Sequence, residues 1–137
     1  MKRMNREKLI NAFEQIAQTE GYFFYTAENR FMPQMVKLHP AMWLAPPEFK
    51  SMQGHKHGAT TYTVELSLIR LGIKADDKQK RAMSVELEQS LIEIFATLSS
   101  FDFVAEVDKL QINHSSHTQT IHGEVAASAT AEVITIF

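Results

Sequence analysis

Histidine residues are the side chains of this sequence whose type and spacing could do chemistry. His55 and His57 are two positions apart, so both imidazoles could point the same way from an extended loop. A second polar segment has His114, His117 and His122 in it or beside it. Three neutral imidazoles that meet in space could hold a divalent metal ion. Because neither an HExxH motif nor an acidic ligand motif accompanies them, we predict no metal-binding residue.

Two other constellations could suggest hydrolysis. Ser115-Ser116-His117 places a nucleophile type beside a base type, but neighbours in sequence do not make a triad, and no G-x-S-x-G elbow is present. Carboxylates are paired at Asp76-Asp77 and at Glu86 and Glu88. The first pair fits the start of a helix and the second an exposed helix face. We predict no catalytic residue.

Ligands with phosphate groups have little to recognise in this chain. The five glycines form neither GxGxxG nor a Walker-type loop, so we expect no nucleotide and no other cofactor. The net charge of -2 gives no whole-chain reason to bind nucleic acid. Basic residues could form local binding patches at two helix starts, but we favour the interpretation that they lie on solvated helix faces. They are Lys2, Arg3, Arg6 and Lys8, and Lys78, Lys80 and Arg81.

The composition is that of one globular domain over residues 1–137, with 45% hydrophobic and 22% charged residues. There are no cysteines, which excludes disulfides, thiolate catalysis and cysteine-containing zinc sites and favours a reducing compartment. The basic N-terminal residues lead into amphipathic sequence and not into an apolar signal segment. No apolar stretch is long enough for a membrane span, so we expect no membrane partner.

The elements that must position these residues begin with a predicted helix over 5–19, whose apolar stripe comprises Leu9, Ile10, Phe13, Ile16 and Ala17. A short aromatic strand is predicted over 22–26. Four prolines interrupt residues 27–49, which predicts short strands at a sheet edge joined by turns. Residues 51–58 are predicted to be an exposed loop.

The clearest strand is predicted over 60–71, where apolar and polar residues alternate. One face would carry Tyr62, Val64, Leu66 and Leu68, and the other Thr61, Thr63, Glu65 and Ser67. This alternation is typical of a sheet covered on one side only, so we expect the helices to cover the apolar face.

A long helix is predicted from Asp76 and Asp77 to about Ser99, with a stripe of Met83, Leu87, Leu91, Ile94, Phe95 and Leu98. Strands are predicted over 103–112, 118–127 and 130–137, with a polar turn at 113–117. The predicted fold class is therefore α+β: a mixed, mainly antiparallel sheet with an N-terminal helix and one long helix packed on one face.

Two features favour partner proteins over substrates. A half-covered sheet has edges that another subunit can continue. The segment from Trp43 to Phe49 could be a protruding contact arm, or Trp43 could anchor the core.

The layout resembles that of bacteriophage tail terminator, or tail-completion, proteins. The matching pieces are 9–17, 62–68, 83–98 and 133–137, and the resemblance lies in element order without a diagnostic motif. It implies a structural protein of the virion, made in the host bacterial cytoplasm, that forms a homo-oligomeric ring. Such a ring caps the tail tube and contacts the head-side connector, and it has no catalytic residues. The alternative is a small α+β ligand-binding or metal-dependent enzyme domain that uses the histidine-bearing loops, and nucleic-acid binding is the least favoured.

Overall fold

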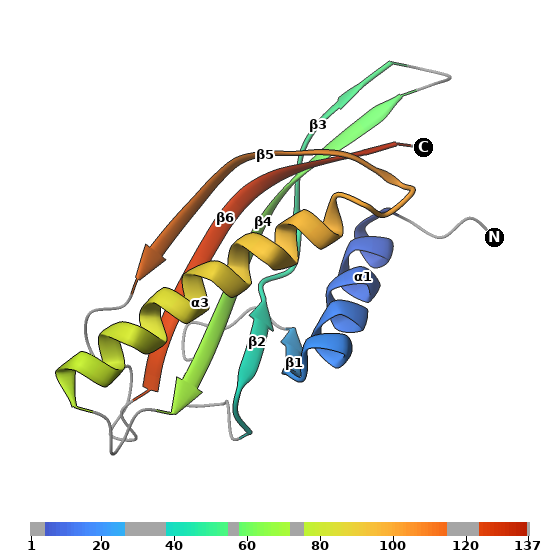
Figure 1. Cartoon of the computed structure of the whole chain (residues 1–137). Helices are drawn as coiled ribbons and strands as arrows, with labels where there is room; N and C mark the ends of the chain where they lie inside the picture. Colours follow the sequence, from blue (N-terminus) through green and yellow to red (C-terminus); the bar gives the residue numbers. More distant parts are fainter. Residues whose placement is uncertain (1–4, 27–37, 55–57, 72–75, 115–123, 137) are drawn as a thin grey trace.

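The computed structural model describes residues 5–26, 38–54, 58–71, 76–114 and 124–136. In these residues, two helices cover one face of a six-stranded, mostly antiparallel sheet (Figure 1), which confirms the predicted α+β class. The helices are α1 (Asn5–Glu20) and α3 (Asp77–Leu98). The strands are β1 (Phe23–Thr26), β2 (Ala41–Leu44), β3 (Glu48–Gln53), β4 (Ala59–Leu71), β5 (Val104–His114) and β6 (Glu124–Ile136).

The sheet has the strand order β1-β2-β4-β6-β5, and β1 and β2 are its parallel pair. β2 and β3 both pair with the same edge of β4, β2 opposite 66–69 and β3 opposite 59–63. Between them lie Pro46 and Pro47, which cannot donate to a ladder. The predicted edge position is right for β3. It is wrong for β2, which pairs with β1 along its outer edge and whose four side chains are buried in clusters on the two faces of the sheet.

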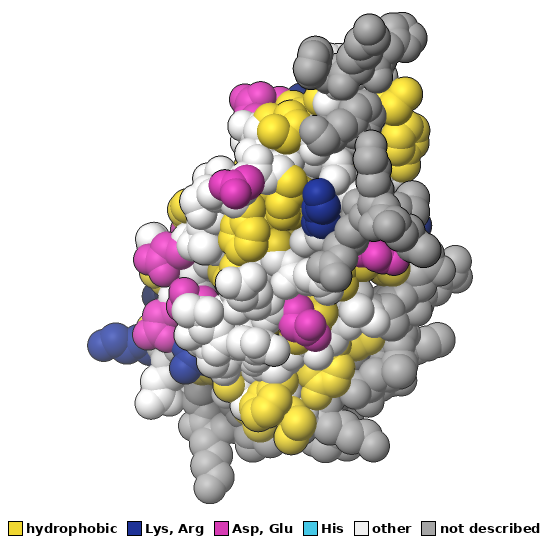
Figure 2. Space-filling view, turned by 90° about the vertical axis from the view of Figure 1, so that its right-hand side faces the viewer, with side chains coloured by type: hydrophobic (Ala, Val, Ile, Leu, Met, Phe, Trp, Pro, Cys, Tyr) yellow, Lys and Arg dark blue, Asp and Glu magenta, His cyan; other side chains and the backbone are white. Residues whose placement is uncertain are grey.

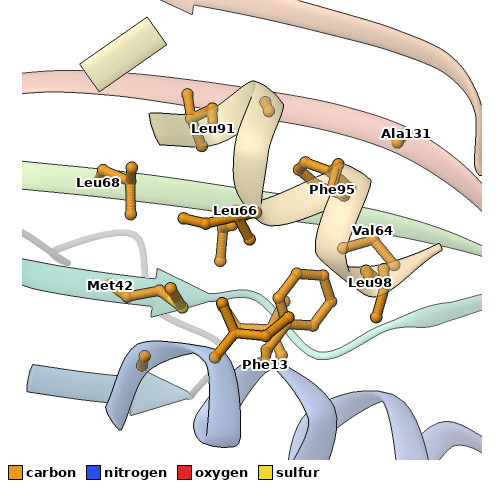
Figure 3. Close-up of a cluster of buried hydrophobic side chains, with 14 of the residues drawn as sticks. Phe13, Met42, Val64, Leu66, Leu68, Leu91, Phe95, Leu98 and Ala131 are labelled. Atoms are coloured by element: carbon orange, nitrogen blue, oxygen red, sulfur yellow. The ribbon is translucent and has the colours of Figure 1, made fainter. Parts of the chain in front are cut away.

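The core lies between the sheet and the two helices. The alternation predicted for β4 is confirmed, since Tyr62, Val64, Leu66 and Leu68 are buried on the side that faces the helices, here called the helix side. Figure 3 shows Phe13 of α1 and Phe95 of α3 meeting above this row. Their ring centroids are 5.7 Å apart with planes at 73°, the edge-to-face arrangement that aromatic pairs favour.

The start of α3 has the capping carboxylate that the acidic residues predicted, and Asp76 and Gln79 complete it as a capping box. The Asp76 carboxylate accepts a hydrogen bond from the Gln79 amide at 2.8 Å, and the Gln79 side chain accepts one from the Asp76 amide at 2.9 Å. Two of the amide groups that a helix start leaves unpaired are thereby satisfied.

The strand after β5 differs from the prediction. Two strands with a break near Ser128 were expected, but β6 runs without interruption from Glu124 to Ile136 because β4 pairs with its whole length. Several small residues of β6 lie beneath α3 and let the helix approach the sheet. On the helix side they are Ala127, Ala129 and Ala131.

Two strands include residues that were predicted to lie in loops. Ser51, Met52 and Gln53, predicted as part of a loop at 51–58, belong to β3 because they pair with the start of β4. Asn113 and His114 are the last residues of β5 and pair with β6. Residues 27–37, 55–57 and 115–123 lie outside the described part of the chain.

Candidate functional site

A β-hairpin formed by β3 and the first half of β4 extends beyond both helices (Figure 1). All six residues of β3 are exposed. One edge of β3 pairs with β4, and no other described strand pairs with its opposite edge. Backbone N–H and C=O groups along that edge can therefore accept a further strand. We call this hairpin the arm.

The arm carries large apolar side chains that no described residue buries. Phe49 is 64% exposed and Met52 is 57% exposed. Both lie on the helix side, because their partners in register are Tyr62 and Thr60. The Phe49 ring contacts the Tyr62 ring edge-on, with centroids 6.4 Å apart. Figure 2 shows hydrophobic side chains at the surface near the top, the level of the arm in Figure 1, and further separate patches below. Exposed aromatic and methionine side chains of this kind are enriched at protein interfaces.

The opposite face of the sheet, here called the far side, is held by a charge cluster. The Glu132 carboxylate of β6 accepts a hydrogen bond from Lys50 of β3 at 2.6 Å and contacts the Lys109 ammonium of β5 at 3.1 Å. The hydrogen bonds from Lys50 and Lys109 hold the pKa of the Glu132 carboxyl below its ordinary value, and the bond to Glu132 raises the pKa of Lys109. This cluster ties three strands together across the far side.

The rest of the far side is mainly polar, as the alternation of β4 predicted. Thr63 and Glu65 are exposed, and the Ser67 hydroxyl shares a 2.7 Å hydrogen bond with that of Ser128. Near β1 and β2 this side carries a small buried cluster, in which Trp43 stacks on Tyr25 with ring centroids 6.0 Å apart. Trp43 is therefore a core anchor, and the protruding part of the predicted contact arm is β3.

A second open edge belongs to β5, which pairs with β6 and with no other described strand. Its register with β6 shifts twice, and Lys109 at the second shift has a φ of 54°, an uncommon conformation for a residue other than glycine. On the helix side β5 carries three half-buried apolar residues, Val107, Leu110 and Ile112. On the far side it exposes Glu106 and Asp108.

The predicted chemical candidates do not come together in the described residues. His55, His57, His117, His122, Ser115 and Ser116 lie outside them. His114 lies 3.0 Å from the Glu88 carboxylate of α3, and Glu86 forms an ion pair with Arg70 of β4, so both acids of that helix face have partners. The described residues contain no group of three metal-ligating side chains.

The predicted basic patches are dispersed. Arg6 is exposed on α1, and the Lys8 ammonium lies 5.9 Å from the centre of the Phe103 ring, a cation–π contact within the chain. Lys2 and Arg3 fall outside the described residues. Lys78, Lys80 and Arg81 lie in the first turns of α3, on a different element from α1.

No protein-family model matches this chain, and no curated protein matches it. Among the described residues, no helix has the length and hydropathy needed to cross a membrane.

Proposed function

We propose that this chain is a structural virion-assembly protein, a bacteriophage tail terminator or tail-completion protein. Its copies form a ring that caps the tail tube and joins the tube to the head-side connector. The protein acts in the tail and neck of the virion after synthesis in the host bacterial cytoplasm. The resemblance in element order motivates the family, and the exposed arm is the observation that carries an assembly role.

The arm supports assembly because it combines exposed apolar side chains with a backbone edge that no other described strand pairs with. An exposed strand edge invites association, and proteins that stay monomeric protect such edges. Phe49 and Met52 add large surfaces that association can bury. A ring in which each copy uses the same contacts lets one short edge strand hold many subunits together.

The test is the particle mass of the purified protein, measured by light scattering after size exclusion across a range of concentrations and salt. A single mass equal to a whole-number multiple of the 15.6 kDa chain, with ring-shaped particles in electron micrographs, is expected. The ring should also stop elongation when it is added to growing tail tubes assembled from a tube protein. A monomer that leaves tube length unchanged at every concentration refutes the proposal.

The same preparation tests the alternative enzyme. Equilibrium dialysis against zinc, manganese and nickel ions should leave no stoichiometric metal on the protein. Tight binding of one metal ion per chain, lost when His57 is replaced by Ala, would favour the metal-dependent alternative.

A further inference from the structure

We propose that the ring is built by strand pairing: the free edge of β3 in one copy pairs with the free edge of β5 in the next, so that the sheets join into one. This inference rests on the proposed function. It adds the contact surface, because the two edges belong to opposite ends of the same sheet path, β3-β4-β6-β5. Two different edges make a heterologous contact, which closes into a ring when the rotation between copies permits it.

Strand direction suits this contact. β3 is antiparallel to β4, β4 to β6, and β6 to β5, so β3 and β5 run in opposite directions. A rotation about an axis along the strands preserves these directions in every copy. The joint between copies is then antiparallel, the more stable kind of strand pair.

The helix sides of the two edges also match. Phe49 and Met52 of β3 are exposed there, and β5 offers the half-buried side chains of Val107, Leu110 and Ile112. Phe49 lies level with Val107, because both are in register with the pair of Tyr62 and Val133, so pairing of the two edges would bury these two apolar side chains together.

The far sides carry charges of both signs. β3 has Glu48 and Lys50, and β5 has Glu106, Asp108 and Lys109. In an antiparallel joint, Lys50 lies between the levels of Glu106 and Asp108, so this cation can approach both acids of β5.

Closure explains why this joint is favoured over a two-fold contact between two copies of β3. A two-fold dimer would use both β3 edges and leave both β5 edges open. A closed ring leaves neither edge unpaired, in the same way that a barrel removes the edges of a sheet.

Cysteine cross-linking tests the joint directly, because the chain has no cysteine of its own. Ser51 and Gln53 of β3, and Glu106 and Asp108 of β5, are exposed on the far side, so substitution there leaves the core intact. Each β3 position is changed to Cys together with each β5 position, and the protein is oxidised. At least one pair should give a disulfide ladder that ends at the mass of the ring. A control pairs Gln53→Cys with Glu65→Cys, which lies on the same side at the centre of the sheet, and should not form the ladder.

A second measurement uses charge to break the joint. Met52→Asp should shift the particle from the ring mass to the 15.6 kDa monomer, whereas Val85→Asp should leave the ring unchanged, because Val85 is equally exposed but lies on α3. A ring that resists Met52→Asp and gives no disulfide in any pair overturns this joint and leaves the proposed function standing. Dimers from the single Ser51→Cys or Gln53→Cys variants alone overturn it in favour of the two-fold contact. A chain that stays monomeric before any substitution overturns the proposed function, and the joint with it.

Discussion

Replacing Thr135 by Val tests how the arm is joined to the rest of the fold. The Thr135 side chain is fully buried near the end of β6. Its hydroxyl accepts a hydrogen bond from the Asn5 side-chain amide at 2.9 Å and donates one to the Thr60 carbonyl at 3.0 Å. One hydroxyl therefore connects the start of α1 with β6 and β4.

The expected loss follows from these two bonds. A hydrogen bond contributes about 0.5–1.5 kcal/mol net, so losing two costs about 1–3 kcal/mol. Valine has nearly the same shape, so no cavity forms. The Asn5 amide also contacts the Ile136 carbonyl at 3.2 Å, which limits its share of the loss. At about 2.1 cal/mol/K per residue, a chain of 137 residues unfolds with an entropy of about 0.3 kcal/mol/K, so Tm should fall by about 3–10 °C.

The assay is urea and thermal unfolding followed by far-UV circular dichroism. All variants are compared at one protein concentration, because association raises the apparent stability. Thr63→Val is the matched control, since Thr63 is exposed on β4, and it should change the free energy of unfolding by less than about 0.5 kcal/mol. A double variant with Asn5→Ala should lose less than the sum of the two single losses. If Thr135→Val is as stable as the wild type, the two hydrogen bonds of the Thr135 hydroxyl do not contribute to the stability of the fold.

Three further predictions concern the core, the far side and the cap. Leu91→Ala should lower the free energy of unfolding in urea titrations by about 2–5 kcal/mol, because Leu91 is fully buried. Ile92 is the next residue of α3 and is exposed, so Ile92→Ala should lower it by less than about 1 kcal/mol. Equal losses would contradict the orientation of the helix. Glu132→Gln should destabilise the protein at pH 7. Because the folded pKa of Glu132 lies below its ordinary value of 4.5, the charged carboxylate stabilises the fold above that pH, and the difference between variant and wild type should vanish as pH falls through the folded pKa. A difference that persists unchanged at pH 3 would argue against the lysine contacts. Asp76→Ala should lower stability by about 1 kcal/mol by removing the cap of α3, measured against the exposed Lys78→Ala as control.

The spacing of apolar residues predicted those helices and strands that bury one continuous face. α1, β4 and α3 match the sequence prediction within one or two residues, because each has a continuous apolar row that only one face of a helix or strand can bury. The capping carboxylate of α3 was also predicted, since a carboxylate before an amphipathic run can accept hydrogen bonds from unpaired amides, but the reciprocal bond to the Gln79 side chain was not.

The unbroken course of β6 could not be predicted, because its central residues are small. Ala127, Ser128 and Ala129 have weak strand propensity, and their position is fixed by strands on both sides and by α3 above. The buried position of β2 was missed for a similar reason. It depends on the parallel partner β1, a pairing between segments that the local sequence does not reveal.

The candidate interface was predicted only in part. The sequence indicated a sheet edge open to another subunit, but it assigned Ser51 to a loop and left open whether Trp43 or its neighbours protrude. A proline pair between two short apolar pieces was the available signal, because it separates a buried strand from an exposed one along the same edge of β4.

The place of β6 has a consequence for the order in which the chain can fold. Every other described element precedes β6 in the chain, yet β6 lies between β4 and β5 and pairs with both. During synthesis, β4 and β5 therefore leave the ribosome before β6, the strand that pairs with both of them, has been made. Until β6 emerges, both strands have unpaired edges that can contact other chains. The pairing of β4 with β6 must also span a long stretch of sequence, which slows folding. The proposed assembly through strand edges would therefore start from a nascent chain whose edges are most exposed just before its own sheet is complete.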